Sequence, residues 1–129
     1  MSSVRTLGLF FLLSFLLAGC DTSTFCFIST LSASPATATI FVGSSQKFIA
    51  SGSTTTVACT IQSDPDPATA VVWSVSDPVN VSISNTPGAT FGTATCLGPT
   101  SGAVTVTATL PAEANAGRKL TATSTLTCK

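Results

Sequence analysis

Apolar residues and threonines alternate strictly between positions 104 and 110 of the chain. Successive side chains of a β-strand point to opposite faces of a sheet, so this alternation predicts a strand with one apolar face and one hydroxyl face. The same period of two returns at 71–76 and 120–128, and no segment after residue 20 shows a sustained helical period. We therefore predict an all-β protein that buries its apolar residues between sheets.

Turn-forming residues divide the alternating segments from one another. We predict strands over 31–43 (divided at Pro35), 46–62, 71–76, 79–84, 89–97, 104–110 and 120–128. Proline cannot donate a hydrogen bond to a neighbouring strand, so the first of these strands is expected at the edge of a sheet. About seven to nine short strands of this kind predict an antiparallel β-sandwich with threonine-rich outer faces.

Trp73 is the one tryptophan of the chain and has two interpretations. It lies on the same strand face as Val71 and Val75, which predicts a core residue between two sheets. The alternative is a platform on which a sugar ring stacks. The position of Trp73 on an apolar face favours the core.

The first 19 residues have the features of a secretory signal. Arg5 precedes an apolar run from Leu7 to Leu17, which is shorter than the ~20 residues that a membrane-spanning helix needs. We therefore predict a cleaved signal peptide over residues 1–19. The four residues at the predicted cleavage point, Leu17-Ala18-Gly19-Cys20, resemble the signal of bacterial lipoproteins, Leu-Ala/Ser-Gly/Ala-Cys, at every position.

This resemblance implies that the thiol of Cys20 receives a diacylglycerol and that a peptidase cuts the chain before Cys20. The processed protein is then exported and held through Cys20 in the bacterial cell membrane or outer membrane, where it faces the periplasm or the cell surface. Residues 20–29 are expected to form the lipidated N-terminus and a short tether, and residues 30–129 the folded domain.

The cysteine count fits an exported protein. The chain has five cysteines, and if Cys20 carries the lipid, Cys26, Cys59, Cys96 and Cys128 remain. An even number of cysteines in an exported chain predicts two disulfides. A metal site is the alternative, but it needs clustered ligands, and these four cysteines lie far apart in a chain without histidine.

The charged residues exclude several classes of function. Five basic and five acidic residues are scattered along the chain, which has no histidine. Without a histidine base or a pair of facing carboxylates, we expect no enzymatic activity and no cofactor. No basic patch predicts nucleic-acid binding. Asp64 and Asp66 offer oxygens to Ca²⁺, but Pro65 and Pro67 already explain this segment as a turn, and we assign no metal site.

Four segments in order resemble the group 2 bacterial immunoglobulin-like domain, which occurs in envelope and adhesin-type proteins. The segments are Ser34-Pro35-Ala36-Thr37-Ala38-Thr39-Ile40-Phe41-Val42-Gly43, Gln46-Lys47-Phe48-Ile49-Ala50, Val71-Val72-Trp73-Ser74-Val75-Ser76-Asp77 and Gly102-Ala103-Val104-Thr105-Val106-Thr107-Ala108. They match the family patterns P-x-x-A-T-L-x-V-G, Q-L-x-A, V-T-W-S-S-S-D and G-x-A-T-I-T-A. The resemblance implies an immunoglobulin-like β-sandwich over most of the chain after residue 30. The chain departs from the family in a longer second strand, a longer last hairpin and the four cysteines.

The strand order of such a sandwich suggests how the cysteines pair. The first strand starts at the end of the domain where the second finishes, which implies a Cys26–Cys59 bond. The last strand finishes where the strand predicted at 89–97 stops, which implies a Cys96–Cys128 bond.

These features predict a non-catalytic, lipid-anchored cell-envelope protein that presents an immunoglobulin-like module for contact with a protein or a glycan, as in adhesion and surface display. We expect the contact in the loops 64–70 and 111–119, because loops carry function more often than sheet faces. Two alternatives remain. Asp21, directly after Cys20, resembles an inner-membrane retention signal and favours a periplasm-facing structural or assembly accessory. A rigid disulfide-linked scaffold also suits an enzyme inhibitor.

Overall fold

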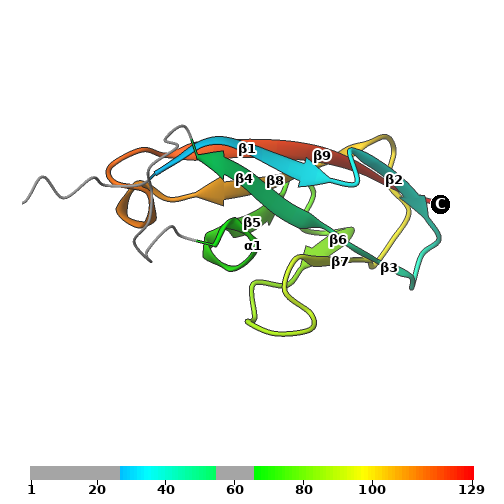
Figure 1. Ribbon diagram of the computed structural model, residues 1–129. Helices are drawn as coiled ribbons and strands as arrows, with labels where there is room; N and C mark the ends of the chain where they lie inside the picture. Colours follow the sequence, from blue (N-terminus) through cyan, green and yellow to red (C-terminus); the bar gives the residue numbers. More distant parts are fainter. Residues whose placement is uncertain (1–26, 55–65) are drawn as a thin grey trace, which may run out of the picture.

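Residues 27–54 and 66–129 are described by the computed structural model of the chain, and they contain nine strands and two short helical turns (Figure 1). The strands are β1 (Ile28–Ser34), β2 (Thr37–Ile40), β3 (Ser45–Lys47), β4 (Ile49–Thr54), β5 (Val72–Val75), β6 (Val81–Ile83), β7 (Thr93–Cys96), β8 (Val104–Leu110) and β9 (Leu120–Cys128). The helical turns are α1 (Pro67–Ala70) and a 3₁₀ turn over Ala112–Ala114. The all-β prediction is confirmed. Among these residues no helix has the length and apolar content needed to cross a membrane.

Several predicted features lie outside the described residues. They are the signal peptide over 1–19, the lipidation site Cys20, the cysteines Cys26 and Cys59, and the second half of the strand predicted over 46–62. The Cys26–Cys59 bond therefore stays a prediction.

The strands form three hydrogen-bonded sheets, in the orders β1-β4, β2-β9-β8-β5 and β3-β7-β6. All pairs are antiparallel except β2 and β9, which run parallel with Thr37 opposite Thr125 and Ile40 opposite Cys128. The expectation of a wholly antiparallel sandwich was therefore wrong at this edge. The cause is the predicted break at Pro35: after it the chain leaves β4, runs on towards the C-terminal end of β9, and pairs there as β2 (Figure 1).

The segment predicted as one strand from Gln46 is divided at Phe48. β3 pairs with β7 and β4 pairs with β1, so the chain changes partner strand at this residue. The N–H of Phe48 donates to the carbonyl of Gly92 at 2.8 Å, and its side chain is buried. The predicted inward face of Phe48 and Ala50 is nevertheless observed, because both side chains are buried.

Three other segments differ from their predicted conformation. Val79 was expected on an inward strand face but lies in a turn and is 79% exposed, because the carboxylate of Asp77 accepts the N–H groups of Val79 and Asn80 and holds the turn. The strand predicted over 89–97 is shortened to β7, since residues 89–92 form a turn. Asp66, placed in a turn, caps α1 by accepting the N–H of Ala68 at 2.9 Å.

One apolar core joins the three sheets. β8 buries Val104, Val106, Ala108 and Leu110 and turns its threonines outward, as the strict alternation predicts. The largest fully buried side chains include Phe48, Leu110, Leu126, Val81 and Val106. The side chains that meet here come from all three sheets, so each sheet buries its apolar face against the others.

Trp73 lies in this core and is 3% exposed. Its ring stands 6.3 Å from the ring of Phe48, centroid to centroid, at a tilt of 47°. Gly92 lies directly against this pair: a Cβ at this position would stand 2.5 Å from the carbonyl oxygen of Phe48, and its φ of +73° also favours glycine. The indole is enclosed and offers no platform for a sugar.

Candidate functional site

A buried asparagine holds the start of the first strand. Asn115, in the loop between β8 and β9, is 1% exposed. Its Oδ1 accepts the N–H of Ile28 at 2.7 Å, and its Nδ2 donates to the carbonyl of Ile28 at 3.0 Å and to that of Arg118 at 3.0 Å. The amide therefore bonds both backbone polar groups of Ile28, the first residue of β1.

The same loop holds the residue before β1. The guanidinium of Arg118 lies over the ring of Phe27, 4.2 Å from its centroid, a cation–π contact. The loop 111–119, expected from the sequence as a contact region, thus fastens the point where the chain enters the fold. We call this the entry end of the domain, defined by Phe27, Ile28, Asn115 and Arg118.

Asn115→Ala is expected to lower the free energy of unfolding by about 1–3 kcal/mol, because it leaves the buried N–H and C=O of Ile28 without partners. Urea unfolding followed by circular dichroism measures the change. Arg118→Ala serves as the control, since its side chain is exposed, and we expect a loss of about 1 kcal/mol or less. Equal effects of the two variants would contradict the role given to Asn115.

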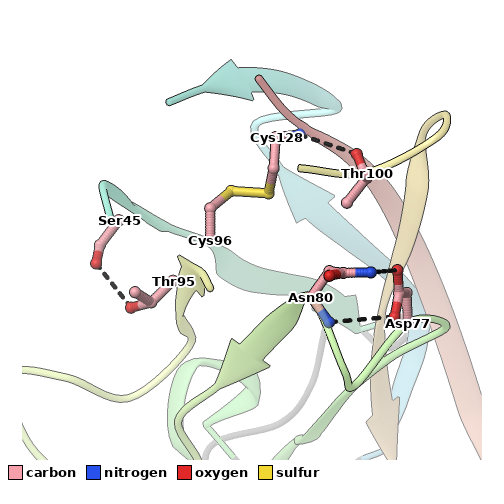
Figure 2. The surroundings of a disulfide bond; sticks show 7 residues. All are labelled: Ser45, Asp77, Asn80, Thr95, Cys96, Thr100 and Cys128. Atoms are coloured by element: carbon pink, nitrogen blue, oxygen red, sulfur yellow. Dashed lines mark hydrogen bonds between the residues drawn. A yellow bond between two sulfur atoms is a disulfide. The ribbon is translucent and has the colours of Figure 1, made fainter. Parts of the chain in front are cut away.

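The opposite end is closed by a disulfide. Cys96 of β7 and Cys128 of β9 are bonded, with Cα atoms 5.8 Å apart, and both are 1% exposed (Figure 2). Thr100 fixes the same strand end: its Oγ1 accepts the N–H of Cys128 at 3.1 Å, and its own N–H donates to the carbonyl of Cys128 at 3.1 Å. The bond joins the two cysteines that the immunoglobulin-like strand order pairs.

Asp77 organises the neighbouring turn (Figure 2). Its Oδ2 accepts Nδ2 of Asn80 at 2.8 Å, and its Oδ1 accepts the N–H groups of Asn80 and Val79, each at 3.2 Å. The side-chain bond from Asn80, and after it the backbone bond from the same residue, hold the pKa of Asp77 below its ordinary value of 3.8, although desolvation acts in the opposite direction. The turn is tied onward to the disulfide strand, because the N–H of Leu97 donates to the carbonyl of Asn80 at 2.7 Å.

The pKa of Asp77 is expected to rise towards its ordinary value in Asn80→Ala, since the strongest donor to the carboxylate is gone. A lowered pKa in the folded state means that the ionised carboxylate stabilises the fold above about pH 4 and that this contribution is lost as the pH falls further. NMR titration of the Asp77 carboxyl carbon in both proteins measures the shift. Identical titration curves would show that Asn80 does not stabilise the charge.

Large apolar side chains are exposed around the disulfide. They are Phe41 (74%), Val42 (44%), Val79 (79%) and Leu97 (56%). Backbone hydrogen bonds link their loops, because the N–H of Gly43 donates to the carbonyl of Cys96 and the N–H of Leu97 to that of Asn80. We call the part of the surface around Phe41, Val42, Val79, Leu97 and the disulfide the far end. β9 starts at the entry end and finishes at the far end, which places the two at opposite ends of the domain.

An apolar groove of about 330 Å³ lies on the flank of the domain, between α1, the β3–β4 junction and the loop from β6 to β7. Its lining residues are Lys47, Phe48, Ile49, Ala68, Thr69, Pro87, Gly88 and Phe91. Three separate stretches of chain build it, and no local pattern in any of them marks a groove. We call it the flank groove.

Of the two aspartates that could offer oxygens to Ca²⁺, the structure describes Asp66, and this residue gives no support for a calcium site. The Oδ1 of Asp66 already accepts the N–H of Ala68, and Asp64 lies outside the described residues. Across 27–54 and 66–129, no three histidine, cysteine, aspartate or glutamate residues are grouped as a metal ion requires.

No protein-family model matches the chain, and no curated protein sequence matches it either. The likeness to bacterial lipoproteins and to group 2 immunoglobulin-like domains therefore rests on the quoted motifs.

Proposed function

We propose that the chain is a non-catalytic, lipid-anchored protein of the bacterial cell envelope that presents an immunoglobulin-like module for contact with a protein or a glycan. The observation that carries the proposal is the difference between the two ends of the domain. Its entry end is used to hold the N-terminal segment, through Asn115 and Arg118. Its far end is fixed by a disulfide and leaves four large apolar side chains exposed.

The strand order supports the immunoglobulin-like part of the proposal. β3 and β4 follow one another with only Phe48 between them, so the two smaller sheets read together as β1, β4 with β3, β7, β6. Constant-type immunoglobulin domains place their first, second, fifth and fourth strands in one sheet and the other three in the second. The remaining sheet, β9-β8-β5 with β2 added at its edge, agrees with this arrangement.

Chain length supports the orientation relative to the membrane. The seven residue-to-residue steps from Cys20 to Phe27 span at most about 25 Å when the chain is fully extended. A lipid on Cys20 would therefore keep the entry end near the membrane. β9 adds about 30 Å at the ordinary rise of a strand, so the far end reaches partners only within several tens of ångströms of the bilayer.

The anchor is tested by Cys20→Ala. We expect the wild-type protein to sediment with membranes and the variant to be found in the soluble fraction, because a cysteine at this position is the acceptor of the lipid. Recovery of both proteins in the same fraction would remove the anchor from the proposal.

Surface display is tested against the periplasmic alternative by labelling whole cells with a membrane-impermeant amine reagent. Lys47, Lys119 and Lys129 are exposed and are available to it. We expect labelling in intact cells. Labelling only after the envelope is opened would favour the structural or assembly accessory that Asp21 suggests, and would contradict surface display.

A further inference from the structure

The flank groove has the size and lining of a binding site. Its volume of about 330 Å³ lies at the lower limit of pockets that hold small ligands or single side chains. Ile49 lines it and is 51% exposed, so an apolar ligand can contact this side chain. In Figure 1, α1 and the loop between β6 and β7 lie on the same side of β4. Residues of all three of these segments line the groove.

Lys47 is the one charged residue among those that line the groove. Its Nζ donates to the carbonyl of Ala89 at 2.8 Å, which holds the ammonium group at the wall formed by the β6–β7 loop. An ammonium group has three protons, so two remain for other acceptors. Among the described residues of the lining elements and their caps, the acidic residue is Asp66, and its Oδ1 accepts the N–H of Ala68. The described lining of the groove is therefore apolar, with the positive charge of Lys47 at its wall.

We propose that the flank groove binds a peptide segment of a partner protein in which a carboxylate adjoins an apolar side chain. The apolar side chain lies against Ile49 and Phe91, and the carboxylate accepts a hydrogen bond from Lys47. This inference rests on the proposed function, because it names the class of partner that the module contacts. Among the described lining residues only Lys47 and Thr69 have polar side chains, which favours a peptide over a neutral glycan, because a sugar needs many more hydrogen-bond partners.

The probes are N-acetyl-phenylalanine as the free acid and the same compound as the amide, which differ only in the carboxylate. The full chain, purified from bacterial membranes in detergent, is titrated with each, and backbone amide shifts are followed by NMR. We expect saturable shifts at Ile49, Thr69 and Gly88 with the acid, and binding of the amide weaker by about fivefold. Absence of saturable shifts at these residues, or equal affinity for acid and amide, would overturn the proposal.

Two variants separate charge from shape. Lys47→Met keeps the aliphatic stem and is expected to remove the preference for the acid, whereas Ile49→Ser is expected to weaken both compounds. Lys129→Met, which changes a lysine at the far end, is the matched control and should bind as wild type does. A preference for the acid that survives in Lys47→Met would contradict the assignment.

The outcome is independent of the anchor. Binding in solution does not require a lipid on Cys20. A protein that carries the lipid but does not bind the probes therefore contradicts the groove proposal alone. A protein that binds the acid but has an unmodified Cys20 overturns the anchor alone.

Discussion

Trp73→Ala is expected to lower the free energy of unfolding by about 3–5 kcal/mol, the usual cost of deleting a buried large aromatic ring. Trp73 is 3% exposed and packs against Phe48 in the core shared by the three sheets. Gly92 has no side chain that could fill the cavity, and it lies directly against Trp73. Urea unfolding followed by circular dichroism measures the loss.

Val72→Ala is the matched control for this variant. Val72 is the preceding residue of the same strand and is 54% exposed on the opposite face. We expect a change of about 0.5 kcal/mol or less, as for exposed substitutions in general. A small effect of Trp73→Ala would contradict the core position, and a large effect of Val72→Ala would show that this face is covered by something.

Removal of the Cys96–Cys128 disulfide by substituting both cysteines with serine is expected to lower the free energy of unfolding by about 3–4 kcal/mol. The bond closes a loop with a sequence separation of 32 and restricts the unfolded chain. This is a large share of the roughly 5–15 kcal/mol that stabilises an ordinary domain. Urea unfolding of the variant and of wild type, both without reductant, measures it.

Peptide mapping of the non-reduced wild-type protein accompanies this experiment. We expect Cys96 in one peptide with Cys128, and Cys26 in one peptide with Cys59. A link from Cys26 to Cys96 or Cys128 would contradict both the observed bond and the predicted one.

The strands that a local pattern defines were predictable. β8 and the inner face of β9 follow directly from an alternation of apolar and hydroxyl residues, and so does the burial of Trp73 in β5. The interruption at Pro35 was predictable as well, since proline lacks the N–H that a ladder needs. In each case the local sequence decides the outcome, without a contribution from distant residues.

What depends on distant partners was not predictable. The break at Phe48 exists because its N–H finds the carbonyl of Gly92, more than forty residues later. Val79 was assigned inward from its spacing to Val81, but the Asp77 carboxylate folds the preceding residues into a turn. The parallel pairing of β2 follows from where the chain crosses, which no period reveals.

The candidate sites divide in the same way. The Cys96–Cys128 bond was reachable from the strand order, because strand ends that meet can be inferred from topology. Asn115 carried only a weak signal, a lone asparagine in a hairpin loop, and its partner Ile28 lies 87 residues away. The flank groove had no signal, because its walls come from three stretches of chain.

The central claim is that Cys20 is the lipidated first residue of the processed protein. The most direct measurement is mass spectrometry of the N-terminal peptide of protein purified from bacterial membranes. We predict a peptide that begins at Cys20 and carries a diacylglycerol on its thiol. A peptide that still contains residues before Cys20, or a Cys20 with a free thiol or a disulfide, would contradict the account.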